Sequence, residues 1–169
     1  YALHKNWREA QKNIRQLKID RWAEMSLHRP ELSERILRVT RPVFEPQVTE
    51  QQTNDTLTRV IGILDPAGPV CTHLQALRPE GIGYALANAV QRHLVSELQE
   101  ILDLIENDIG TFWNDLTEGG KTIDSSQMIW KMQRCKMFIR NKSLGFGLER
   151  VLYELNPHLP CQSELVVNY

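Results

Sequence analysis

Long hydrophobic runs are missing from this 169-residue chain, and its N-terminus lacks the pattern of a secretory signal peptide. No apolar stretch approaches the roughly eighteen residues that a membrane-spanning helix needs. Cysteine is scarce as well, with only Cys71, Cys135 and Cys161 at wide spacing. An odd number of distant cysteines argues against a disulfide framework and favours a reducing compartment. We therefore expect a cytoplasmic, intracellular protein without a membrane segment.

Motifs that carry catalysis or bind cofactors are also lacking. The Gly-Lys-Thr triplet at 120–122 would close a phosphate-binding loop, but Asp115 stands where that loop requires its first glycine. A long predicted helix precedes the triplet where a strand is required, so we interpret 117–124 as a joint between helices. Cys71 and His73 lie two residues apart, but no second ligand pair has the spacing of a zinc site. We predict a non-catalytic protein with no metal and no cofactor.

The composition of the chain is that of a folded globular protein, with 41% hydrophobic and 24% charged residues. A chain of this length can form one domain with its own core. It opens on Tyr1 rather than methionine, so we expect a piece of a longer protein. We predict a single helical domain over residues 1–169, in which 50–169 form the main bundle and 1–41 can form a basic N-terminal extension.

Apolar residues recur at helical spacing along most of the chain. The first seam predicts one helix over residues 2–27, and a short helix is expected to begin at Pro30 and end before Pro42. Thr49 and Gln52 form a candidate capping box in front of a helix that ends near residue 64. For that last segment a strand is the alternative.

The longest helical pattern predicts one central helix over residues 81–116, with further helices at 125–140 and from 143 onward. Gly81, Ala85 and Ala89 are four apart on the central helix and predict an edge where another backbone comes close. These patterns predict an all-α fold, an irregular bundle of six to seven helices with one long central helix.

Charge is distributed unevenly along the chain. Residues 1–41 hold ten Lys or Arg and five Asp or Glu, whereas residues 42–120 hold three and twelve. On the first predicted helix the basic residues form a stripe opposite the apolar seam: Lys5, Arg8, Lys12 and Arg15. The stripe can attract nucleic acid or an acidic protein. Alternatively, it is solvated charge that aids solubility, or it docks on the acidic middle of the same chain. Aromatic residues for stacking bases are not interleaved with it.

The predicted helix at 125–140 is apolar on two sides. One seam consists of Met128, Met132, Cys135 and Ile139, and Trp130 and Met137 project from the opposite side. Such a helix is either sandwiched inside the domain or presents a contact surface. Trp, Met and Arg are favoured at protein interfaces. The residues predicted to bind a partner are Trp130, Met137, Lys131, Arg134 and Arg140.

We expect a protein–protein interaction module, of the adaptor or regulatory kind, whose partner is an acidic surface or helix. Pairing of the Leu3–Leu17 seam with a partner helix is a second way to bind a protein. The main alternative is a nucleic-acid-binding or RNA-processing helical domain that uses the basic stripe. An enzyme whose site is assembled from scattered residues is a third reading.

Overall fold

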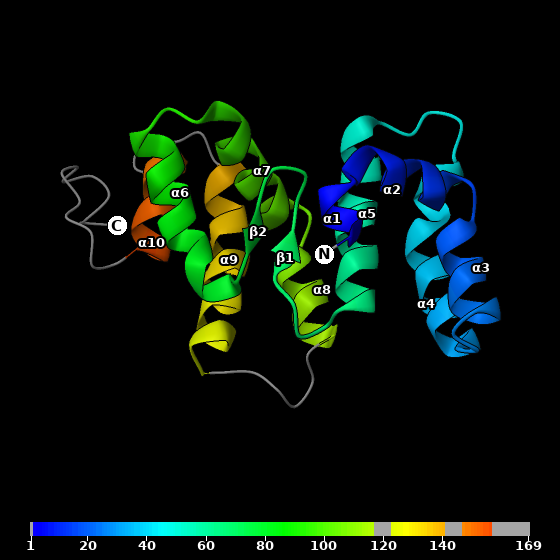
Figure 1. Ribbon diagram of the computed structural model, residues 1–169. Helices are drawn as coiled ribbons and strands as arrows, with labels where there is room; N and C mark the ends of the chain where they lie inside the picture. Colours follow the sequence, from blue (N-terminus) through cyan, green and yellow to red (C-terminus); the bar gives the residue numbers. More distant parts are fainter. Residues whose placement is uncertain (1, 117–122, 141–146, 157–169) are drawn as a thin grey trace. The chain divides into compact units, whose positions relative to one another are not determined.

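The computed structural model describes residues 2–116, 123–140 and 147–156 (Figure 1). The prediction of an all-α fold is confirmed, because these residues form ten α-helices, two short 3₁₀ helices and one two-stranded sheet. Within these ranges, no helix is both long enough and apolar enough to cross a membrane. The chain divides into two compact units, Tyr1–Ala76 and Leu77–Tyr169. This division does not test the prediction of a single domain, which stays a prediction.

Unit 1 is built mainly from helices. Its elements are α1 (Ala2–Lys5), α2 (Trp7–Arg15), α3 (Lys18–Met25), α4 (Pro30–Thr40), η1 (Arg41–Phe44), α5 (Glu50–Leu64) and β1 (Val70–Cys71), and β2 (Ala76–Leu77) pairs with β1 at the end of the unit. The predicted capping box begins α5: Gln52 N–H donates to Thr49 Oγ1 at 3.1 Å, and Thr49 N–H donates to Gln52 Oε1 at 2.8 Å. The segment to Leu64 is therefore a helix and not a strand.

The prediction of one helix over residues 2–27 is wrong. The chain breaks at Asn6 and again at Leu17, which adopts a left-handed backbone with φ 53°. A left-handed conformation costs a residue with a side chain about 1–2 kcal/mol. The turn at Leu17 redirects the chain, so that Ile14 of α2 and Ile19 of α3 are both buried. Burial of a second apolar face offsets the cost of the break.

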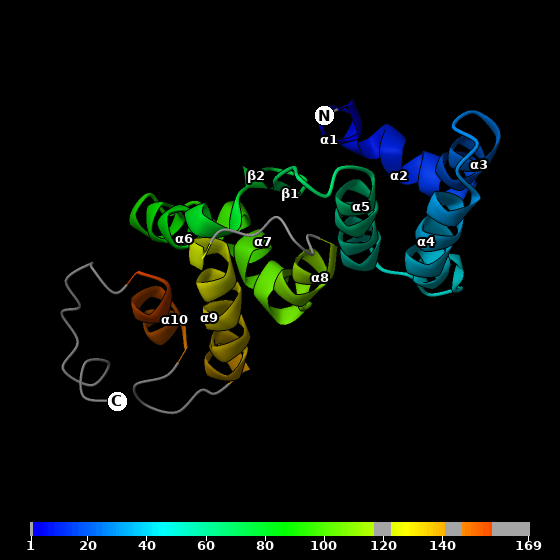
Figure 2. The same cartoon turned by 90° about the horizontal axis from the view of Figure 1, so that it is seen from below.

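The apolar seam of α2 is covered by the chain itself. Trp7, Ala10 and Ile14 are buried, and α2 packs against α3 and α5. The alternative in which this seam pairs with a partner helix is therefore wrong. Farther along the unit, α3 and α4 lie side by side (Figure 2), and α4 packs against α5.

Unit 2 has a core shared by four helices. Its elements are η2 (Pro79–Gly81), α6 (Ile82–Gln91), α7 (Val95–Glu106), α8 (Ile109–Leu116), α9 (Ile123–Arg140) and α10 (Leu148–Leu155). Side chains of α6, α7, α9 and α10 meet in one cluster: Ile82, Leu86, Ile101, Ile105, Met132, Cys135, Phe138, Val151 and Leu155. Because α9 contributes three of these residues, its orientation is fixed by the core.

The single central helix predicted over 81–116 is wrong, because α6, α7 and α8 are separate. Two residues with left-handed backbones, His93 and Asp108, both with φ 55°, separate them. After α6, His93 N–H donates to the carbonyl of Val90 at 3.2 Å, and Leu94 N–H donates to the carbonyl of Ala89 at 2.9 Å. These two bonds form a Schellman motif, which ends a helix. His and Asp tolerate the left-handed region better than most residues with side chains.

A close approach between helices lies at Gly83, which is not one of the residues of the predicted edge, Gly81, Ala85 and Ala89. A Cβ atom on Gly83 would lie 2.5 Å from the carbonyl oxygen of Leu155, whereas nothing lies within 4 Å of the same position on Gly81. Asn156 Nδ2 also donates to the carbonyl oxygen of Gly83 at 2.8 Å. The absence of a side chain at Gly83 thus lets the end of α10 rest on the start of α6.

Candidate functional site

Helix α9 buries one side and exposes the other. Its buried side packs against α7, α8 and α10, and includes Met132 and Cys135 of the predicted seam. On the opposite side Trp130 is 55% exposed and Met137 is 66% exposed. Of the two interpretations of these side chains, burial inside the domain is therefore excluded.

Trp130, Arg134 and Met137 follow one another at intervals of four and three residues, so they form a stripe along α9. The guanidinium carbon of Arg134 lies 4.8 Å from the centre of the Trp130 ring. A guanidinium at this distance over an indole ring is attracted by about 0.5–1 kcal/mol at an exposed site. The contact restricts the Trp130 ring although solvent surrounds more than half of it.

A carboxylate on α10 holds Arg134 in place. Glu154 accepts from Arg134 Nη1 at 2.9 Å, and its second oxygen lies 3.5 Å from Arg150 Nη2. The side chains of Glu154 and Arg150 are only 9% and 11% exposed. Salt screens ion pairs that are shielded from water less than it screens surface pairs. Removing one partner of such a pair leaves the other charge buried without compensation. The order of contacts is therefore Trp130, Arg134, Glu154 and Arg150, running from the surface into the unit.

Arg150, the inner arginine of this cluster, also lies over aromatic rings. Its guanidinium is 5.2 Å from the centre of Phe138 and 5.5 Å from that of Tyr153. Arg134 and Arg150 thus both contact Glu154. Of the other predicted residues, Arg140 is exposed and Lys131 is half-buried, and neither has an ion-pair partner within the described ranges.

The basic stripe of the sequence is distributed over two helices. Lys5 ends α1, whereas Arg8, Lys12 and Arg15 lie on α2, and all four are exposed. Lys12 lies 3.4 Å from Glu9, and Arg15 Nη2 donates to Thr53 Oγ1 at 3.0 Å.

Trp7, the aromatic residue of α2, is not available for stacking. It is buried on the inner side of the helix, where its Nε1 donates to Asn54 Oδ1 at 2.7 Å. Its ring also contacts the rings of His4 and His73. A nucleic acid at the stripe would thus meet charge without an aromatic platform.

The two described thiols are poor nucleophiles. Burial, with a smaller contribution from Glu154, raises the pKa of Cys135 to about 12. Burial also raises the pKa of Cys71. A thiol acts as a nucleophile or a metal ligand when it is ionised, so neither is active near neutral pH. Cys161 lies outside the described residues. In the part of the chain that the structure describes, no three His, Cys, Asp or Glu side chains gather as metal ligands.

The Gly-Lys-Thr triplet at 120–122 lies outside the described residues. Helix α8 ends at Leu116, before it, and α9 begins at Ile123, after it. A phosphate-binding loop follows a strand, so a preceding helix does not fit that motif.

No known protein family, curated protein or solved structure matches this chain. The chemistry of the described surfaces is therefore the basis for inferring a function. Sequence reasoning found the exposed residues of α9 but missed Glu154, which organises them. The spacing of Arg150 and Glu154, four residues apart on a predicted helix, was a signal for their own ion pair. Nothing in the sequence indicated the contact with Arg134.

Proposed function

We propose that this protein is an interaction module, of the adaptor or regulatory kind, that binds an acidic amphipathic segment of a protein partner. The binding surface is the α9 face, defined as Trp130, Arg134 and Met137 with Lys131 and Arg140 at its edges. One observation carries the proposal: two large apolar side chains stay exposed on a stripe whose arginine is already fixed by a buried carboxylate.

Apolar burial supplies the affinity in this proposal. Full burial of a side chain such as methionine is worth about 1.5–3 kcal/mol, and aromatic residues bury still more area. Binding normally costs about 0.5–1.5 kcal/mol for each flexible side chain that becomes ordered. Contact with the Trp130 ring and with Glu154 has already restricted Arg134. The α9 face therefore loses less conformational entropy on binding than an unsupported surface would.

Positive charge at the edges selects the partner. Lys131 and Arg140 have no acidic partner among the described residues. Rim charges of one sign steer a partner of opposite charge and mainly accelerate association. The partner expected here is an acidic helix with apolar residues at spacings of three and four, which lays its apolar side on Trp130 and Met137.

The proposal can be tested by panning a displayed library of 16-residue peptides on the protein. The enriched peptides are then tested for binding to the Trp130→Ala, Met137→Ala double variant, and circular dichroism confirms that this variant is folded. The enriched peptides should be acidic and carry aliphatic or aromatic residues at helical spacing. Enrichment of basic peptides, or of peptides that bind the double variant equally well, would contradict the proposal.

Nucleic-acid binding by the basic stripe is the second candidate, because Arg8, Lys12 and Arg15 remain exposed on one helix. It predicts binding of labelled RNA or DNA that weakens steeply with salt, since each phosphate contact releases counterions. Fluorescence anisotropy at two salt concentrations measures this. A loss of binding in Arg8→Gln, and not in Trp130→Ala, would favour this candidate over the α9 face.

A further inference from the structure

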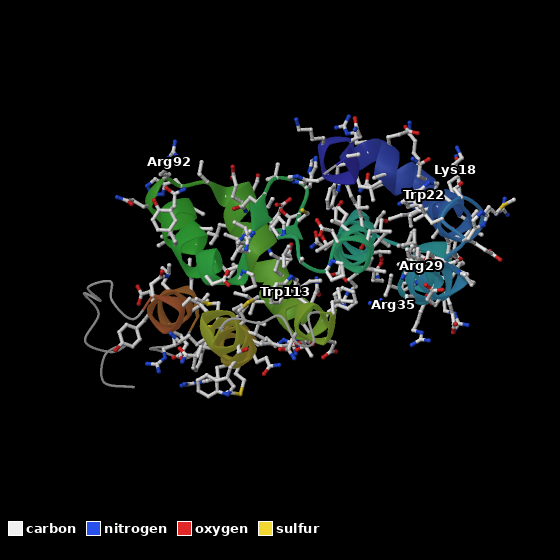
Figure 3. All side chains as sticks on the ribbon, turned by 60° about the horizontal axis from the view of Figure 1, so that its bottom comes forward. Lys18, Trp22, Arg29, Arg35, Arg92 and Trp113 are labelled. Atoms are coloured by element: carbon white, nitrogen blue, oxygen red, sulfur yellow. The ribbon has the colours of Figure 1, made fainter. Side chains whose placement is uncertain are left out.

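The four methionines of the chain differ widely in their exposure to solvent. Met137 on α9 is 66% exposed, whereas Met132 on the same helix is 3% exposed and belongs to the core cluster of unit 2. Met128 is half-buried and packs against that cluster. In unit 1, Met25 is 73% exposed and follows Trp22, labelled in Figure 3, by one turn of α3. Two thioethers are therefore accessible, one in each unit.

The accessible sulfur atoms are those of methionine and not of cysteine. Cys71 and Cys135 are buried, and burial raises the pKa of both thiols, so the reactive thiolate is scarce near neutral pH. A methionine thioether needs no ionisation to react with an oxidant, only access to it. Among the described sulfur atoms, a small oxidant in water therefore reaches Met25 and Met137 first.

We propose that Met137 is an oxidation site, and that its conversion to the sulfoxide by hydrogen peroxide releases a partner from the α9 face. The thioether sulfur attacks one oxygen of the peroxide, so that an S–O bond forms while the O–O bond breaks. The departing hydroxide takes the proton of the sulfur-bound hydroxyl through solvent and becomes water. Sulfur is oxidised and the peroxide is reduced, so hydrogen peroxide is the only co-reactant. This inference rests on the proposed function, because it concerns the regulation of the same surface.

Oxidation changes the character of the surface at the point where the partner is expected to lie. A thioether is flexible and apolar, whereas a sulfoxide is polar and chiral. In the proposed complex, the apolar side of the partner covers Trp130 and Met137. A polar group buried against apolar side chains without a hydrogen bond costs free energy, so the oxidised face binds more weakly.

The fold should withstand the same reaction. Met137 is not part of the core cluster, and the methionine that is, Met132, lies five residues earlier on the buried side of α9. Oxidation of Met132 would place a polar group in the core, but its burial keeps peroxide away. Mild oxidation should thus modify the contact surface while the circular dichroism spectrum stays unchanged.

The first experiment measures the order in which the methionines react. The protein is treated with hydrogen peroxide, catalase stops the reaction at intervals, and mass spectrometry of proteolytic peptides follows each methionine. Met25 and Met137 should gain an oxygen atom well before Met132. This result does not depend on any partner. Equal rates for Met137 and Met132 in protein that stays folded would overturn the proposal.

The second experiment measures the affinity for a sulfur-free acidic peptide selected on the α9 face, before and after treatment. Oxidation should raise the dissociation constant roughly tenfold, since full burial of a methionine side chain is worth at least about this factor. Methionine sulfoxide reductases with a dithiol should restore the affinity. Every form of the protein carries Cys161→Ser, so that this thiol does not contribute.

Two variants assign the effect to one sulfur atom. Met137→Leu keeps an apolar side chain of similar size, so it should bind the peptide well and keep its affinity after peroxide treatment. Met25→Leu is the matched control, because it removes the other exposed methionine; treatment should weaken its binding as it does for wild type.

Three results would overturn the proposal: unchanged affinity of the oxidised wild type, an equal loss in Met137→Leu, or protection by Met25→Leu. Failure of the proposed function has a different signature. In that case the untreated protein would bind the peptide no better than Trp130→Ala does, and both the function and this inference would be refuted.

Discussion

Replacing Gly83 with alanine should displace α10 from α6 and thereby disturb the charged cluster that supports the α9 face. The new Cβ would lie 2.5 Å from the carbonyl oxygen of Leu155 and 3.1 Å from its carbonyl carbon. Both are backbone atoms, so no side-chain rotation relieves the contact. The two helix ends must separate by at least about 0.5 Å before the shorter distance reaches 3.0 Å.

The expected loss of stability follows from three contributions. Overpacking of this kind costs about 1–3 kcal/mol. Separation also weakens the bond from Asn156 Nδ2 to the carbonyl oxygen of Gly83, and a hydrogen bond contributes about 1 kcal/mol. Alanine is a better helix former than glycine by up to about 1 kcal/mol, which offsets part of the loss. The free energy of unfolding should therefore fall by about 1–3 kcal/mol.

Urea denaturation followed by circular dichroism measures this change. Gly81→Ala is the matched control, because nothing lies within 4 Å of its Cβ position, and its stability should stay within about 0.5 kcal/mol of wild type. Glu154 lies on α10, so Gly83→Ala should also weaken binding of peptides selected on the α9 face. If Gly83→Ala is as stable as Gly81→Ala, the close approach of α10 to α6 is refuted.

Three more substitutions test particular contacts. Stability should fall as pH rises from 9 toward 12, by at most about 1.4 kcal/mol per pH unit, because the Cys135 thiol ionises near its ordinary pKa only when unfolded; denaturation of Cys135→Ala across this range should lack that component. His93→Gly should raise stability by about 0.5–1 kcal/mol by relieving a left-handed backbone, whereas Gln91→Gly, at the last residue of α6, should not raise it in the same urea assay. Glu154→Gln should lower stability by about 1.5–3 kcal/mol, because it removes the charge that contacts Arg134 and the largely buried Arg150, and the exposed Glu149→Gln should change stability little; equal losses would contradict the buried cluster.

Local patterns in the sequence predicted the helical class and several packed faces. The Thr49–Gln52 capping box forms as expected, and Met132 and Cys135 lie in the core. These features depend on residues within one or two turns, which is the range over which helical periodicity carries information. The helix breaks at Leu17 and His93 had no such signal. Residues with side chains rarely adopt left-handed backbones, so a smooth apolar pattern was taken for a continuous helix.

The supporting contacts of the α9 face were beyond sequence reasoning for a different reason. The amphipathic pattern placed Trp130 and Met137 opposite the buried seam, but it left open whether another helix covers them. The answer depends on how α7, α8 and α10 pack around α9. The contact of Glu154 with Arg134 likewise joins residues of two helices that are twenty positions apart in sequence, so it exists only once the core has formed.

The most direct test of the account is the dissociation constant of one selected acidic peptide for three forms of the protein. Trp130→Ala should weaken binding by roughly 30-fold, because truncation of a central interface residue typically costs about 2 kcal/mol or more. Tyr84→Ala removes an aromatic side chain that is 77% exposed on α6, away from the α9 face, and should leave the affinity unchanged. Equal affinities for wild type and Trp130→Ala would contradict the claim that the α9 face binds the partner.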